Sequence, residues 1–156
     1  MVRKETIDYV RRTAGGALIQ EGKILLGLRS SERNYYPDVW DVFGGHLEEE
    51  ESPDAALARE LKEELGITQP KFEQIAIFNE PRVLEYGYAE HHIYAVTSWL
   101  GKPTKLGNEH SEIGWFTPEA MGRLSLASAL YLQLFTKYLE RDIHSRKIRT
   151  VQALSV

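Results

Sequence analysis

The chain has 156 residues, a formal net charge of −4 and no cysteine, with 42% hydrophobic and 27% charged residues. This length and composition are typical of one globular domain, and the lack of cysteine excludes disulfides, thiolate metal sites and cysteine nucleophiles. The acidic balance argues against nucleic acid as a partner. No apolar run approaches the roughly 20 residues that span a bilayer, and residues 1–8 lack a secretory signal, so we expect a soluble cytoplasmic protein without membrane attachment.

The first third of the chain is expected to form strands. The apolar runs 17–19 and 23–28 flank Glu21-Gly22, which favours a β-hairpin. Residues 30–37 are polar and predict an exposed loop, and residues 40–43 predict a short strand that leads into a pair of glycines.

Residues 52–65 have the pattern of an amphipathic helix. Ser52 is a suitable N-cap, Pro53 fits the first helical position, and Gly66 stands where a glycine often ends a helix. Leu57, Leu61 and Leu65, extended by Ala58, form its apolar stripe.

The remaining elements are three strands and a second helix. The strands are predicted at 71–78, 88–100 and 112–116, and the helix at 126–139. Strands and helices mix without regular alternation, which favours an α/β (α+β) fold with a mixed β-sheet between helices.

The first helix carries three glutamates on one face, Glu60, Glu63 and Glu64. Like charges three or four positions apart destabilise a helix by a few tenths of a kcal/mol per pair, and acidic groups near its C-terminus are also unfavourable. A divalent cation would offset these costs. Oxygen ligands select a hard ion, so Mg²⁺ is favoured, with Mn²⁺ as a substitute. The alternative is a solvated acidic face.

The spacing around this face favours the metal. Nine residues around the acidic face define this spacing: Gly45, Glu51, Arg59, Glu60, Leu61, Glu63, Glu64, Gly66 and Ile67. This pattern over residues 45–67 resembles the Nudix box at every specified position. The resemblance implies the Nudix fold, in its MutT-like branch, over a single domain of residues 1–156.

The resemblance also implies roles for individual residues. Glu60, Glu63 and Glu64 match the metal-binding glutamates of the family, and Glu64 matches the most critical one. Arg59 and Glu51 match a supporting ion pair that would orient these carboxylates.

Two further site positions lie around the box. The Gly44-Gly45 turn resembles the loop whose backbone approaches the metal, so Gly45 is included among the metal-site residues. On the loop before the last strand, Glu109 matches a glutamate of MutT-like enzymes that serves as metal ligand or base. Glu112 is the weaker candidate, and both could be merely exposed loop carboxylates.

The substrate pocket is less evident. Arg29 resembles a basic residue that contacts substrate phosphates in MutT-like enzymes, with an ordinary surface arginine as the alternative, and Tyr36, Trp40 and Phe43 are the expected pocket residues. The other aromatic candidates for stacking on a base are Tyr35, Tyr88 and Tyr94. His46, His91 and His92 lack a metal-ligand pattern and are expected to be structural.

The expected function is Mg²⁺-dependent hydrolysis of a nucleoside triphosphate, which could be an oxidised one such as 8-oxo-dGTP, to the monophosphate and pyrophosphate. Two alternatives stay open. One is hydrolysis of ADP-ribose or a nucleotide sugar, and the other is a binding module that senses a nucleotide without cleaving it. The partner would be the small nucleotide itself, and a homodimer is an expectation from relatives.

Overall fold

The computed structural model describes residues 10–154, so residues 1–8, where no secretory signal is expected, lie outside the described part. The elements in chain order are β1 (Arg11–Gln20), β2 (Lys23–Arg29), β3 (Trp40–Asp41), β4 (Phe43–His46), α1 (Pro53–Leu65), β5 (Thr68–Asn79), α2 (Val83–Tyr86), β6 (Ala89–Leu100), β7 (His110–Phe116), α3 (Pro118–Met121) and α4 (Leu130–Leu154).

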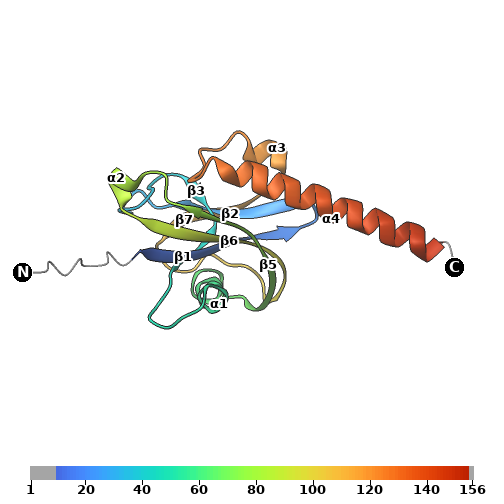
Figure 1. Ribbon diagram of the computed structural model, residues 1–156, viewed down its shortest axis with the longest axis horizontal. Helices are drawn as coiled ribbons and strands as arrows, with labels where there is room; N and C mark the ends of the chain where they lie inside the picture. Colours follow the sequence, from blue (N-terminus) through green and yellow to red (C-terminus); the bar gives the residue numbers. More distant parts are fainter. Residues whose placement is uncertain (1–9, 155–156) are drawn as a thin grey trace, which may run out of the picture.

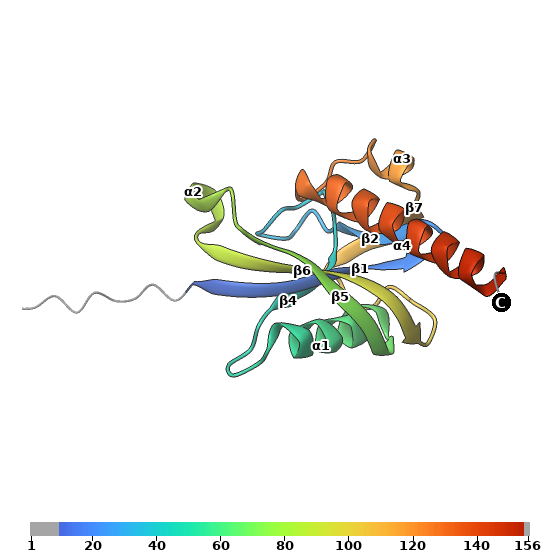
Figure 2. The ribbon, with the colours of Figure 1, turned by 45° about the vertical axis from the view of Figure 1, so that its right-hand side comes forward.

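The seven strands of residues 10–154 join one mixed sheet. Its main order is β3-β2-β1-β6-β5, while β4 pairs with β1 and β7 pairs with β2. The central pair β1 and β6 is parallel, and the other pairs are antiparallel. Helix α1 lies on one side of the sheet, and α3 and α4 lie on the other (Figure 1). Figure 2 shows the same arrangement from a second direction. The predicted fold class is confirmed.

The alternation of side chains along the strands gives each helix its own core. On β1, Ala14 and Leu18 pack into the cluster under α1, whereas Ala17 and Ile19 pack into the cluster under α4. Successive strand residues point to opposite faces, so a strand with apolar residues on both faces fits a sheet covered on both sides.

Two local predictions are confirmed. The β1–β2 hairpin turns at Glu21-Gly22, with Gln20 opposite Lys23. Helix α1 begins after Ser52, whose hydroxyl accepts a hydrogen bond from the Ala55 amide at 3.1 Å, and it ends at Gly66 in a left-handed conformation (φ 69°). The buried apolar face includes Ala56, and not the predicted Ala58.

The strand expected at residues 40–43 is divided at Val42. Residues 40–41 pair with β2 and residues 43–46 pair with β1, so the chain changes neighbours between them. The Asp41 carboxylate accepts the Val42 amide at 2.8 Å, which satisfies a donor that neither strand pairing uses. This change of neighbour places Gly44 and Gly45 in β4, where they pair with β1 beside α1.

The second helix differs from its predicted bounds at both ends. It begins at Leu130, because the preceding residues extend beside β3: the Trp40 amide bonds to Ser125, and the Ala127 amide bonds to Trp40. It continues to Leu154, and its second half projects past the sheet (Figure 1). Within residues 10–154, no helix combines the length and apolar character that a membrane span needs.

Candidate active site

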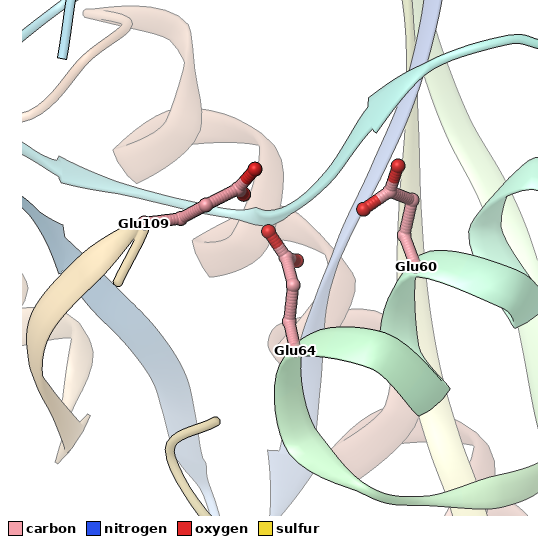
Figure 3. A group of neighbouring side chains, drawn as sticks. All are labelled: Glu60, Glu64 and Glu109. Carbon is pink, nitrogen blue, oxygen red and sulfur yellow. The ribbon is translucent and has the colours of Figure 1, made fainter. Parts of the chain in front are cut away.

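Three carboxylates converge at one edge of α1. Glu60 and Glu64 rise from neighbouring turns of the helix, and Glu109 reaches them from the residue before β7 (Figure 3). One oxygen from each side chain can be chosen so that all three lie within 4.8 Å of one another. Among the described residues, this is the group whose geometry could hold a metal ion.

Glu64 is the most confined of the three. It is 6% exposed, and neither of its carboxylate oxygens has a hydrogen-bond partner. Burial, followed by the nearby Glu109 and Glu60 carboxylates, raises the pKa of Glu64 to about 11. A buried carboxylate without donors is unfavourable, and a divalent cation is the ligand that would satisfy both oxygens at once.

Gly45 touches the carboxylate of Glu60. A Cβ atom at Gly45 would lie 2.4 Å from Glu60 Oε1, so no larger residue fits unless the carboxylate moves. At Gly44 an added Cβ would lie 1.9 Å from the carbonyl oxygen of Ala14, on the strand β1 that pairs with β4. The two glycines therefore allow the backbone to approach both the sheet and the acidic cluster.

Arg59 organises the carboxylates around it. Its Nε and Nη2 each lie 2.8 Å from one oxygen of Glu51, and its Nη1 donates to Glu60 Oε1 at 2.9 Å. A further bond from Nη2 reaches the His46 carbonyl at 3.1 Å. The ion pair lowers the pKa of Glu51 to about 2, chiefly through the hydrogen bonds from Arg59. The guanidinium thus fixes the orientation of Glu60.

Two predicted carboxylates lie outside this cluster. The Glu63 side chain is 58% exposed and faces Arg59 Nη1 at 3.3 Å, and it does not belong to the three-carboxylate group. Glu112 is exposed on β7, opposite Leu28 of β2. Of the two loop candidates, Glu109 is therefore the one that the fold brings to α1.

A cavity of about 350 Å³ opens beside the carboxylates. Glu60 and Glu109 line its acidic end, together with Gly45 and Arg59. Its other walls are aromatic and polar, and they include Arg11, Arg29, Arg33, Tyr35, Tyr36, Asp41, Glu80, Tyr86, His91 and Tyr131. The arrangement can hold a charged group at one end and a flat, partly polar group at the other.

The residues predicted for substrate binding are divided by the fold. Arg29 and Tyr36 line the cavity. Trp40 and Phe43 are not among its lining residues: Trp40 packs edge-on against Phe116 at 4.8 Å, and Phe43 is fully buried under α1.

The other aromatic candidates also separate. Tyr35 lines the cavity, while Tyr94 is buried and donates a hydrogen bond to Asp54 at 2.7 Å, and Tyr88 is 67% exposed. His91 contributes to the cavity wall and is hydrogen-bonded to Thr13 (2.6 Å) and Glu80 (2.9 Å).

Several cavity residues were not identified from the sequence. Asp41 accepts hydrogen bonds from Tyr131 (2.9 Å) and the Val42 amide, and burial raises its pKa. Arg33 lies in the loop 30–37, with Nη2 3.5 Å from Glu109 Oε1. The sequence gives no sign that this loop arginine meets Glu109, because the two residues are 76 positions apart and share no local pattern.

Comparisons with known proteins agree with this geometry. The family model for the NUDIX domain matches residues 10–135. Nucleoside triphosphatase NudI of Enterobacter sp. (strain 638) is 33% identical over 140 residues, which are 83% of this chain and 98% of that protein. CTP pyrophosphohydrolase of Escherichia coli is 34% identical over 110 residues, covering 70% and 78%.

A solved structure gives the same result for the fold. The MutT NUDIX hydrolase from Burkholderia pseudomallei superposes with a TM-score of 0.72 at 25% identity, covering 80% of this chain and 96% of that one. The family match extends well beyond the box, over residues 10–135, and so includes Glu109 on the loop before β7. The chain therefore belongs to the Nudix family and is a pyrophosphohydrolase.

Proposed function

We propose that this protein is a Mg²⁺-dependent nucleoside triphosphate pyrophosphohydrolase, which releases a nucleoside monophosphate and pyrophosphate. The observation that carries the proposal is the convergence of Glu60, Glu64 and Glu109, of which Glu60 and Glu109 line a cavity of about 350 Å³. That volume falls near the lower end of the range of about 300–1,000 Å³ for small-molecule sites.

The donor set fits Mg²⁺. All three side chains offer oxygen, and the two buried oxygens of Glu64 lack any donor. Magnesium takes carboxylates together with water and phosphate oxygens, and two of the three carboxylates, Glu60 and Glu109, line the cavity, which leaves room for a substrate beside them. We include Mn²⁺ as a substitute, and we keep Glu63 and the Gly45 backbone as candidates for weaker or water-mediated contacts.

The proposed division of labour follows from charge. A bound metal ion would neutralise phosphate oxygens and lower the pKa of a water molecule. Glu109 or a box glutamate would accept the proton of the attacking water. Arg59 would hold Glu60 in place through the 2.9 Å hydrogen bond, with Glu51 securing Arg59 from its other side. Arg29 and Tyr36 would contact the substrate from the cavity wall.

The substrate class is supported by the relatives. Two of them are named for hydrolysis of nucleoside triphosphates, one of these for CTP, and an 8-oxo-dGTP diphosphatase of Buchnera aphidicola is 30% identical over 89 residues. We therefore propose a nucleoside triphosphate, with an oxidised one as a specific candidate. We further propose that residues 1–156 form one Nudix domain that acts in the cytoplasm, where nucleotides are plentiful. A homodimer stays a prediction.

The test is hydrolysis of a substrate panel with Mg²⁺, with every product identified. The panel contains canonical and oxidised nucleoside triphosphates, ADP-ribose and nucleotide sugars. Glu64→Gln removes the proposed metal ligand, and Glu119→Gln is the matched control, because Glu119 is an exposed residue of α3.

We expect monophosphate and pyrophosphate from one or a few triphosphates, activity lost in Glu64→Gln, and normal activity in Glu119→Gln. Cleavage confined to ADP-ribose or a nucleotide sugar would replace the proposed substrate class. Tight nucleotide binding without turnover by the wild-type protein would instead indicate a sensor. Normal turnover by Glu64→Gln would refute the metal assignment.

A further inference from the structure

We infer that Arg33 is a phosphate-binding residue of this site, and that its guanidinium pairs with Glu109 only until a metal ion binds that carboxylate. The inference rests on the proposed function, since it requires a metal ion at Glu109 and a phosphate substrate beside it. It assigns a role to a loop residue that lies outside the Nudix box.

The guanidinium of Arg33 lies at the acidic end of the cavity. Its Nη2 is 3.5 Å from Glu109 Oε1, a long separation for an ion pair. Its Nε is buried and has no hydrogen-bond partner. A guanidinium has five donors, four of them on its two Nη atoms, and within residues 10–154 these make one loose contact, with a proposed metal ligand, so the Nη donors can turn to a ligand.

The loop that carries Arg33 is attached to the segment that carries Glu109. The Ser30 amide donates to the Glu109 carbonyl at 3.0 Å, and the Ser30 hydroxyl donates to the Asn108 carbonyl at 2.7 Å. The Arg33 amide closes a turn onto the Ser30 carbonyl at 3.1 Å. These bonds fix the start of the loop relative to the carboxylate.

The other end of the loop is held by Tyr36. Its hydroxyl donates to buried Glu80, and its amide donates to the Tyr86 hydroxyl at 3.3 Å. The rings of Tyr36 and Tyr86 lie 4.5 Å apart, and the Arg82 guanidinium stands 5.1 Å from the Tyr86 ring centre. Arg33 is thus presented from a loop that is fixed at both ends.

Arg29 differs from Arg33 in what its guanidinium contacts. Its Nε donates to the carbonyls of Tyr35 (2.9 Å) and Tyr36 (3.1 Å), and its Nη1 is 3.9 Å from Asp41. The Nε of Arg29 therefore holds the loop, while Arg29 still lines the cavity, whereas Arg33 pairs with a carboxylate of the acidic cluster. Of the two arginines, Arg33 is the one placed to reach a phosphate beside a metal ion at Glu109.

The electrostatics give Arg33 a different effect on each ligand. A cation 3.5 Å from Glu109 competes with a metal ion for that carboxylate, so Arg33 opposes metal binding when no substrate is present. Once a phosphate occupies the site, the same guanidinium can form charge-assisted hydrogen bonds to its oxygens. A residue that only maintained the fold would affect both ligands in the same direction.

The experiment measures both ligands separately in the full chain. Mn²⁺ alone is titrated by electron paramagnetic resonance, and inorganic tripolyphosphate is titrated by calorimetry in saturating Mn²⁺, which removes any contribution from a base. The variants are Arg33→Gln, Arg33→Lys and the control Arg123→Gln, whose arginine is exposed on the surface after α3. Thermal melting checks that each variant folds.

We expect Arg33→Gln to bind Mn²⁺ at least as tightly as the wild type and to bind tripolyphosphate about 10-fold to 100-fold more weakly, the range expected for lost hydrogen bonds to a charged group. The tripolyphosphate affinity of Arg33→Lys should lie between those of the wild type and Arg33→Gln, because lysine keeps the charge and loses the planar fork. Arg123→Gln should bind both Mn²⁺ and tripolyphosphate with the affinity of the wild type.

Two results would overturn the inference: unchanged tripolyphosphate affinity in Arg33→Gln, or weaker binding of both Mn²⁺ and tripolyphosphate, which would indicate a structural role. Failure of the wild-type protein to bind Mn²⁺ would instead refute the proposed function, so the two failures are distinguishable.

Discussion

Glu64→Gln should increase the stability of the metal-free protein while it removes hydrolytic activity. In the structure this carboxyl is 6% exposed and has no hydrogen-bond donor, and Glu60 and Glu109 stand beside it. The folded state must either leave a charge there or protonate the group. Glutamine keeps the shape of the side chain and removes this cost, but it is a poor ligand for Mg²⁺.

The size of the effect follows from the pKa of Glu64, which burial and the neighbouring carboxylates raise from 4.5 to about 11. The folded state then holds a proton that the unfolded chain has released, so stability falls as pH rises between these two values. The cost is about 1.4 kcal/mol per pH unit, or about 3 kcal/mol at pH 7. For a chain of this size, each kcal/mol changes the melting temperature by about 2–4 °C.

The assay is thermal unfolding of wild type and Glu64→Gln in EDTA, at several pH values between 5 and 8. We expect the variant to melt several degrees higher at pH 7, with a difference that grows as pH rises, because glutamine does not titrate. Addition of Mg²⁺ should raise the melting temperature of the wild type and leave that of the variant nearly unchanged. The Glu119→Gln control should follow the wild type throughout.

Two results would refute this reasoning. A variant that melts below the wild type in EDTA would mean that the Glu64 carboxyl stabilises the metal-free fold. A difference that does not change with pH would mean that the carboxyl is not held protonated by its surroundings.

Three further substitutions test the parts around the cluster. Gly45→Ala adds a Cβ 2.4 Å from Glu60 Oε1, so we expect Mn²⁺ affinity to fall by about tenfold or more, and unchanged affinity in a titration would contradict the close approach. Arg59→Lys loses the planar fork and its 2.9 Å bond to Glu60, which should lower kcat by about tenfold or more with little change in melting temperature; full activity would mean that the fork is dispensable. Tyr36→Phe removes a donor from buried Glu80 and should destabilise the protein by about 1–3 kcal/mol in urea unfolding, while a neutral effect would show that the loop is held by its other contacts.

Local sequence patterns were sufficient for the elements whose signals lie within a few residues. The caps at Ser52 and Gly66 and the turn at Glu21-Gly22 depend on a hydroxyl oxygen that accepts a nearby amide and on glycine conformations that neighbouring residues specify, and all three are as predicted. The box spacing likewise identified the helix that carries Glu60 and Glu64, because positions four apart lie on one helix face.

Long-range pairing decided what the local patterns left open. Residues 40–43 have the composition of one strand, yet they divide because their two halves pair with different neighbours. A helix is predicted from residue 126, but Leu126 and Ala127 pair with Trp40 of β3, and α4 begins only at Leu130. In both cases the backbone donors found partners far away in the sequence, and those partners outweighed local propensity.

The sequence by itself determined the family signature, the acidic helix and the mixed sheet, because these depend on spacing and periodicity. The tertiary structure decided which carboxylates meet: Glu109 joins Glu60 and Glu64, while Glu63 stays at the surface with Arg59. It also selected which loop residues face the cavity, Arg33 among them. Direction and distance between segments come from how the sheet and α1 pack together, and residue spacing along the chain does not contain that information.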